Sequence, residues 1–224
     1  MFKTGNIIID IFSQGIVFVP LLPVIIILIR SIYQKDVLTF LMILCLLNFI
    51  GGLILWMPKP NKVGLISVQN IFSLFEVLVL LQIFKSALRG KPAEFLKIFL
   101  IAIVSSIVTY YSLQGMDRTS MLITSLQDGI ILLISALSLM HLVRNNHLYI
   151  FHSPLFWISV GTLFYFVMTA LVDVAGRNYM QLPSTHTTEN IILLNIASLI
   201  RYFFYTLAVV FYHSSRSSDN TPLF

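Results

Sequence analysis

Seven long apolar runs, separated by short polar segments, make up almost the whole chain. Each is about 20 residues long, the length that an α-helix needs to cross the hydrocarbon core of a bilayer. Membrane barrel strands are only about ten residues long and alternate in polarity, and these runs do neither. Because lipid offers the backbone no hydrogen-bond partner, each run is predicted to be helical. The runs lie at about 7–30, 37–57, 65–86, 95–114, 120–143, 154–175 and 190–212.

The predicted fold class is therefore all-α: one seven-transmembrane-helix bundle over residues 1–213, followed by a polar cytoplasmic tail at 214–224. Hydrophobic residues make up 58% of the 224 and charged residues only 10%, whereas a soluble domain carries about 25% charged residues. The remaining polar surface is too small to cover a water-soluble globule. We predict a multi-pass protein of a cell (inner) membrane, with the lipid bilayer as its main partner.

The distribution of lysine and arginine favours an orientation with the N-terminus outside and the C-terminus in the cytoplasm, because cytoplasmic loops carry an excess of these residues. In this orientation eight of them lie inside and five outside, which with Arg201 in a span accounts for all 14. The inner residues are Arg30, Lys35, Lys85, Arg89, Lys91, Lys97, Arg144 and Arg216, and the outer ones are Lys3, Lys59, Lys62, Arg118 and Arg177. The net charge of +5 fits these loops, and no nucleic-acid partner is expected.

Three ionisable residues lie deep within predicted spans: Glu76 in the third, Asp128 in the fifth and Arg201 in the seventh. An ionisable side chain at mid-bilayer costs a few kcal/mol, so it marks a candidate functional site. In the proposed orientation all three lie roughly nine to eleven residues from the outer surface, and hence in one layer. One arginine can hold two carboxylates in a planar network. The sequence predicts a polar site in this layer, facing the outer side.

Helical phase places further polar residues on the same faces as these three, pointing into the bundle. The predicted lining adds Gln69, Ser73, Gln127, Tyr165, Asn195 and Tyr202. The same faces also carry Ser159, Thr162, Thr169, Ser198 and Tyr205. A bundle in lipid also uses such residues as plain interhelical hydrogen bonds. A structural network and a ligand-binding or signal-sensing site therefore remain alternatives.

Several kinds of chemistry are excluded or unsupported. No lysine follows Lys97, so a retinal Schiff base has no amine in the last span. None of the five histidines pairs at the spacing that puts two metal ligands on one helical face. Neither a Gly-x-Ser-x-Gly motif nor a phosphate-binding glycine loop is present. We expect no cofactor, no metal and no catalytic residue.

Backbone features predict local deviations from straight helices. Pro20 and Pro23 are expected to kink the first span, because each removes a backbone hydrogen bond. In the second span, Asn48 with Gly51 and Gly52 permits either close packing or a bend. Trp157 is expected at the membrane interface, where aromatic residues gather.

Two stretches carry a resemblance to a known group of proteins. One runs from Asn70 to Glu76 and reads NIFSLFE, and the other runs from Pro154 to Gly161, reads PLFWISVG and is followed by Tyr165. Together with the seven-span layout, they resemble uncharacterised small seven-span membrane proteins of Bacteroidota-type bacteria. Similar segments serve as membrane input modules of sensor histidine kinases. The resemblance implies a bacterial inner-membrane sensor, and it transfers no role to any residue.

The favoured function is therefore a membrane sensor or signal-relay module that responds through Glu76, Asp128 and Arg201. With no kinase domain in the chain, a separate cytoplasmic or membrane partner would carry the signal, meeting the basic third loop. A small transporter or channel subunit is the first alternative, although such proteins usually show internal repeats and none is visible here. A lipid-acting enzyme, in which the acids do acid–base work, and an assembly subunit are the others.

Overall fold

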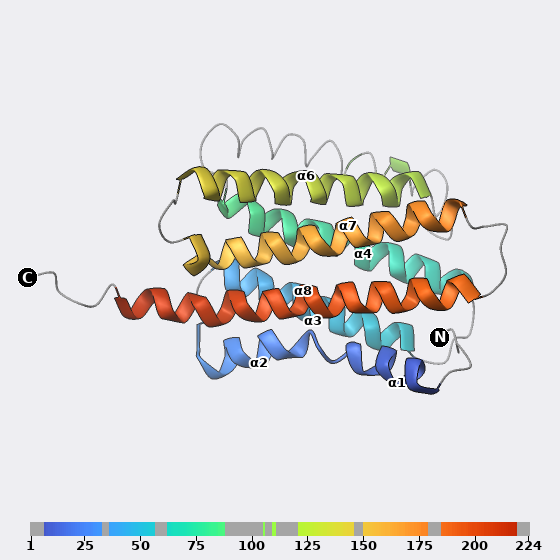
Figure 1. Ribbon diagram of the computed structural model, residues 1–224, viewed down its shortest axis with the longest axis horizontal. Coiled ribbons are helices and arrows are strands. Elements are labelled where there is room, and N and C mark those ends of the chain that lie inside the picture. The colour runs from blue at the N-terminus through green and yellow to red at the C-terminus, as the bar shows by residue number, and fades with distance from the viewer. Residues whose placement is uncertain are drawn as a thin grey trace, which may run out of the picture.

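The computed structural model describes residues 7–32, 36–56, 62–87, 105, 109–110, 121–145, 150–178 and 185–218, and every regular element among them is helical. Figure 1 shows long helices with their axes roughly parallel. The predicted run at 95–114 lies outside the described residues apart from 105, 109 and 110. The helices are α1 (Ile7–Ile16), α2 (Leu21–Ile29), α3 (Asp36–Trp56), α4 (Lys62–Ala87), α6 (Met121–Asn145), η1 (Ile150–His152), α7 (Pro154–Asn178) and α8 (Thr185–Ser218).

Within the described ranges, five helical segments are long and apolar enough to cross a membrane: Ile11–Ile29, Asp36–Ile54, Gln127–Arg144, Pro154–Val172 and Glu189–Tyr212. The most extensive contact joins α7 to α8, and α8 also packs against α1 and α2. Large apolar side chains on the outside of the bundle, such as Phe203 and Met140, are exposed because lipid is their natural neighbour. The all-helical, membrane-type fold predicted from the sequence is thus confirmed.

The first predicted span is broken near its middle, between α1 and α2. Pro20 has no N–H to donate, and the turn before it changes to tighter bonds, with the N–H of Val19 donating to the carbonyl of Ile16 at 3.1 Å. Pro23 lies inside the first turn of α2, where a missing N–H costs nothing. The predicted kink is confirmed at Pro20, whereas Pro23 contributes none.

The C-terminal end of α2 is closed by a Schellman motif. Ser31 has a positive φ of 51°, the conformation that usually requires glycine there. The N–H of Ile32 donates to the carbonyl of Ile27, and the N–H of Ser31 to that of Leu28. Ile32 and Ile27 are both buried, which supplies the hydrophobic contact that accompanies this motif.

The glycines of the second span serve close packing, and α3 continues unbroken from Asp36 to Trp56. A Cβ at Gly52 would lie 2.9 Å from Val17 Cγ1, and one at Gly51 would lie 3.1 Å from the ring of Phe72. The two residues therefore let the first span and α4 approach α3 closely. Of the two predicted alternatives, close packing is observed and a bend is not.

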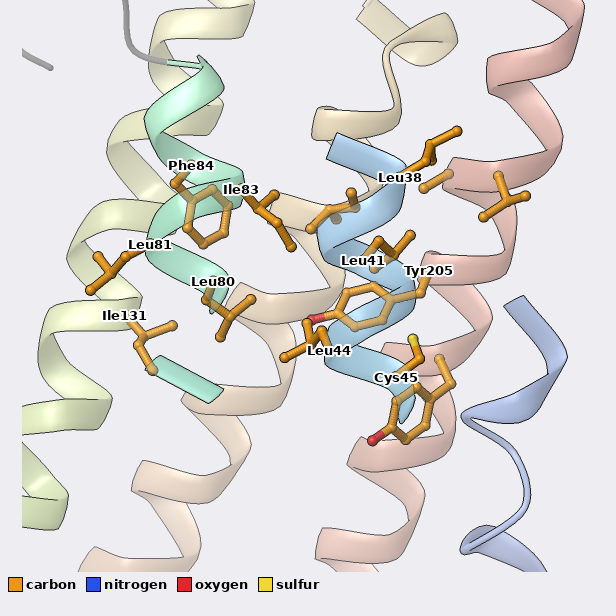
Figure 2. Close-up of a cluster of buried hydrophobic side chains, with 14 of the residues drawn as sticks. Leu38, Leu41, Leu44, Cys45, Leu80, Leu81, Ile83, Phe84, Ile131 and Tyr205 are labelled. Carbon is orange, nitrogen blue, oxygen red and sulfur yellow. The ribbon is translucent and has the colours of Figure 1, made fainter. Parts of the chain in front are cut away.

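A continuous apolar core fills the half of the bundle that contains the C-terminal half of α8. Figure 2 shows side chains from α3, α4 and α6 meeting there, with the ring of Tyr205 from α8 among them. The fully buried members include Leu38, Leu41, Leu44, Leu80, Ile83 and Ile134. The buried polar residues described in this half include the hydroxyl residues Ser135, Ser138, Ser159 and Thr162.

The last helix is longer than its apolar segment. The apolar part, Glu189–Tyr212, has 24 residues, and at about 1.5 Å per residue it already spans a bilayer core. The helix nevertheless continues to Ser218, and Figure 1 shows this end projecting past the neighbouring helices. The tail predicted from residue 214 therefore begins as a continuation of α8.

Trp157, expected only as an interfacial aromatic, also joins α7 to α8. Its ring stacks between Phe204 and Phe211, with centroids 5.9 and 5.4 Å away and planes within 20° of parallel. Its Nε1 donates a 2.7 Å hydrogen bond to the carbonyl of Phe151. The indole thus packs its apolar faces on α8 and satisfies its polar edge at η1, just before α7.

Candidate functional site

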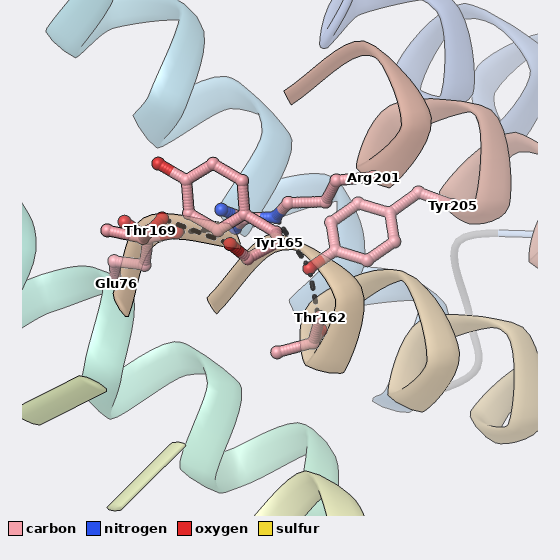
Figure 3. A network of polar contacts seen from close by, with 6 residues as sticks. All are labelled: Glu76, Thr162, Tyr165, Thr169, Arg201 and Tyr205. Atoms are coloured by element: carbon pink, nitrogen blue, oxygen red, sulfur yellow. Dashed lines mark hydrogen bonds and ion pairs between the residues drawn. The ribbon is translucent and has the colours of Figure 1, made fainter. Parts of the chain in front are cut away.

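The centre of the candidate site is an ion pair between Arg201 on α8 and Glu76 on α4 (Figure 3). The side chain of Arg201 is 2% exposed and that of Glu76 is 18% exposed. Both residues lie near the middle of their helices, where lipid would leave a charge unsolvated, so both turn inward. The predicted meeting of these two residues, 125 positions apart in the chain, is confirmed.

The second hydrogen bond of Arg201 goes to a phenol. Its Nε donates to the Tyr205 hydroxyl at 2.9 Å, and that oxygen also lies 2.9 Å from the Thr162 hydroxyl on α7. The guanidinium was expected to hold two carboxylates, Glu76 and Asp128. Its hydrogen bonds instead go to one carboxylate and one phenol, because Tyr205 lies one turn along α8, within direct reach of Nε.

Aromatic rings enclose the guanidinium. Its central carbon lies 4.6 Å from the ring centroid of Tyr165 and 5.3 Å from that of Tyr205, and the rings of Tyr202 and Phe166 lie at 5.7 and 5.8 Å. Rings within about 6 Å of a cation attract it through their quadrupoles. The predicted residues Tyr165 and Tyr202 therefore both contact the charge, as faces of a cage and not as hydrogen-bond partners.

A second group of polar residues lies beside the ion pair, between α4 and α6. Ser73, one turn before Glu76, donates to the Gln127 side-chain oxygen at 3.2 Å. Gln127 is 2% exposed, and its neighbour Asp128 is 8% exposed. Gln127 is therefore buried against Ser73, which lies one turn before Glu76 on α4.

One predicted residue, Asn195, lies elsewhere. Asn195 donates a 2.7 Å hydrogen bond to the Ser13 hydroxyl and so joins α8 to α1. It lies six positions before Arg201, about 9 Å along the helix axis, so it is a neighbouring structural contact and not part of the cage. The side chain of Gln69 is outside the described part of the chain.

Two residues of the cage, Phe166 and Tyr205, were not among the predicted site residues. The same is true of Thr162, which contacts the Tyr205 hydroxyl. Thr162 and Tyr205 do lie on the predicted polar faces, and the spacing of four between Arg201 and Tyr205 was the available signal. Phe166 carried no such signal, because a phenylalanine in an apolar run reads as ordinary core or lipid-facing surface.

The polar groups and the apolar core occupy different halves of the bundle. Ser73 and Glu76 precede the buried apolar stretch of α4, and Gln127 and Asp128 precede that of α6. Along α8, Asn195 comes before Arg201, and the buried Ala208 and Val209 come after it. The ion pair therefore lies at the boundary, with amide and carboxylate groups toward the start of α8 and apolar packing toward its end.

Among the described residues, no group of three histidine, cysteine or acidic side chains could hold a metal ion. Neither the cage nor the Ser73–Gln127 group presents a nucleophile beside a base. What the arrangement can do is hold a fixed cation and fixed dipoles at mid-membrane depth. Comparisons with family models, with curated proteins and with solved structures found no match. The resemblance drawn from the sequence therefore stays a prediction.

Replacing Tyr205 with phenylalanine tests the phenol. The change removes an acceptor from a buried charged donor, and hydrogen bonds to charged groups contribute about 1.5–3 kcal/mol. We expect a loss of free energy of unfolding in this range, measured by unfolding in mixed micelles. Thr162→Val, which removes only the neutral partner of the same phenol, should cost about 1 kcal/mol or less. Equal losses in the two variants would contradict the assignment.

Proposed function

We propose that the chain crosses a bacterial inner membrane seven times, with its N-terminus outside and its C-terminus in the cytoplasm. The five membrane-type segments support this, together with α4, whose 26 residues are long enough to span. The excess of lysine and arginine in alternate loops supports the orientation.

Alkaline phosphatase joined after Lys59 should be active, and joined after Arg144 or Ser218 it should be inactive, because that enzyme folds only outside the cytoplasm. Green fluorescent protein joined at the same positions should give the opposite pattern. Activity of the phosphatase after Ser218 would overturn the proposed orientation.

The function best supported is that of a membrane sensor or signal-relay module. The observation that carries this proposal is the Glu76–Arg201 ion pair, which links α4 to α8 through side chains. These two helices are not among the extensively packed pairs of the described bundle. A change at Glu76 would therefore alter the position of α8 relative to α4 without first breaking an extensive direct interface between these two helices.

Helix α8 is suited to carry such a change to a partner. It continues past its apolar segment to Ser218 and projects beyond the neighbouring helices (Figure 1). In the proposed orientation this end lies in the cytoplasm, on the same side as the basic third loop. A ligand that competes for Glu76 would loosen the hold on Arg201 and let α8 shift. Packed helices move between discrete positions. A separate partner protein would bind differently to the two positions of α8.

Distance measurement by double electron–electron resonance tests this proposal. Spin labels at Lys85→Cys and Arg216→Cys, in a Cys45→Ser background, would report the distance between the cytoplasmic ends of α4 and α8. We expect Glu76→Asp, which keeps the charge but shortens the side chain, to shift or broaden the distance distribution. The control Asn195→Ala removes a hydrogen bond of α8 away from the cage and should leave the distribution unchanged. Identical distributions in all three proteins would reduce the ion pair to a structural role.

A transporter is the second candidate, and one observation favours it. The first span is broken at Pro20 within the membrane-type segment Ile11–Ile29, and broken helices often mark transport sites. If the protein transports, uptake into proteoliposomes should disappear in Asp128→Asn. Wild-type proteoliposomes would be supplied with a broad mixture of polar solutes on the outside. If they take up none of them, the sensor is the better proposal.

A further inference from the structure

The amide of Gln127 is a buried group whose hydrogen-bonding capacity is only half used. Its oxygen accepts from Ser73. Its nitrogen has no hydrogen-bond partner in the described part of the molecule, although the residue is 2% exposed. A buried amide N–H₂ that makes no hydrogen bond costs about 1–3 kcal/mol of stability. Such a group is therefore expected to meet a ligand or water atom that accepts a hydrogen bond.

The surrounding charges limit what that ligand can be. Glu76 lies one turn from Ser73, the partner of this amide, and the buried Asp128 follows Gln127 on α6. Arg201 is the only lysine or arginine in the interior of a predicted span. An anionic ligand would add a third negative charge against a single positive one. A cationic ligand would offer the amide N–H₂ no acceptor.

We infer that Gln127, Ser73 and Asp128 form a binding site for a small uncharged molecule that carries hydroxyl groups. A hydroxyl both donates and accepts, so one group can accept from the Gln127 nitrogen while it, or a neighbouring hydroxyl, donates to a carboxylate. Glu76, the ion-pair partner of Arg201, adjoins the site one turn from Ser73. This inference rests on the proposed sensor function, because it names the class of molecule that the sensor would detect.

The place of the site also suits a solute of this class. It lies on the side of the ion pair toward the start of α8, and the apolar core closes the other half of the bundle. A hydroxyl compound bound next to Glu76 competes for the same carboxylate that holds Arg201. Binding would thus act on the ion pair directly, without a relay through other residues.

Solution NMR of the whole protein, with its glutamine side chains labelled with ¹⁵N, tests the ligand class. The Gln127 amide signal is identified by its loss in Gln127→Leu. Glycerol would serve as a water-borne hydroxyl probe and 1-octanol as a membrane-borne one. Acetate and ethylammonium would be the charged controls at equal concentration. We expect a saturable shift of this signal with one of the two hydroxyl probes and with neither ion.

Matched variants make the result specific. Ser73→Ala removes the hydroxyl that orients the amide, so the hydroxyl probe should bind at least about fivefold more weakly, a loss of about 1 kcal/mol. Ser138→Ala, a buried hydroxyl on α6 in the apolar half, should leave binding unchanged. Saturation by glycerol assigns the site to water-borne solutes and saturation by 1-octanol to membrane-borne ones. No saturable shift with either, or saturation by either ion, overturns the assignment. This NMR readout does not involve α8. The titration can therefore be negative while the spin-label distances support the sensor, and it can be positive while the distances do not change.

Discussion

Replacing Glu76 with glutamine is expected to destabilise the bundle more than replacing Arg201 with methionine. Glutamine leaves Arg201 buried with its charge uncompensated, and a guanidinium cannot release its proton in a protein. Methionine leaves a carboxylate that, at 18% exposed, is less deeply buried than the guanidinium. Breaking one side of a buried ion pair costs about 3–5 kcal/mol, so we expect Glu76→Gln in this range and Arg201→Met at least about 1 kcal/mol below it.

The measurement is the free energy of unfolding in mixed micelles, compared at equal pH. The double variant Glu76→Met with Arg201→Met should recover at least half of the larger loss, because a buried pair replaced by apolar groups of similar size is often neutral. The paired losses also have to be non-additive, as expected of residues in direct contact. Additive losses, or a greater loss in Arg201→Met, would show that Arg201 and Glu76 do not depend on each other for stability.

Substitution of Gly161 is expected to have the second large effect, because this glycine sets the distance between α7 and α8. A Cβ there would lie 2.8 Å from Phe204 Cβ and 3.1 Å from the carbonyl oxygen of Arg201. Neither atom is the end of a flexible side chain, so the two helices have to separate. We expect Gly161→Ala to cost about 1–3 kcal/mol, as overpacking does, and Gly161→Leu to prevent accumulation of folded protein.

Gly129 provides the matched control. It lies on α6, is exposed, and a Cβ there would meet nothing within 4 Å. Gly129→Ala should therefore leave stability unchanged or raise it by up to about 1 kcal/mol, the gain expected from helix propensity. Because Gly161 touches the backbone of Arg201 itself, Gly161→Ala should also disturb the spin-label distances that report the ion pair. A stable Gly161→Leu protein with unchanged distances would contradict this account of the α7–α8 contact.

The expected contact between Glu76 and Arg201 is observed, because helical phase and depth alone decide the position of these two residues. Glu76 and Arg201 each sit in the middle of an apolar run, so lipid on one side and the bundle on the other leave one favourable direction for each charge. The same reasoning placed Ser73, Gln127 and Tyr165 on inward-facing stripes of their helices. It could not decide which acceptor each guanidinium nitrogen meets, since that depends on which helices are neighbours. Tyr205 therefore takes a hydrogen bond that was assigned to Asp128.

The sequence by itself determined that this protein is helical and belongs in a membrane, because apolar runs of about 20 residues leave the backbone no other partners. It also determined which faces point inward, where the first span breaks and that one arginine has to find a carboxylate. Only the tertiary structure decided the pairing of Glu76 with that arginine, the aromatic cage and the close approach at Gly161. These depend on which helices lie side by side and at what height, which is set by the packing of all the spans together and not by the pattern within any one of them.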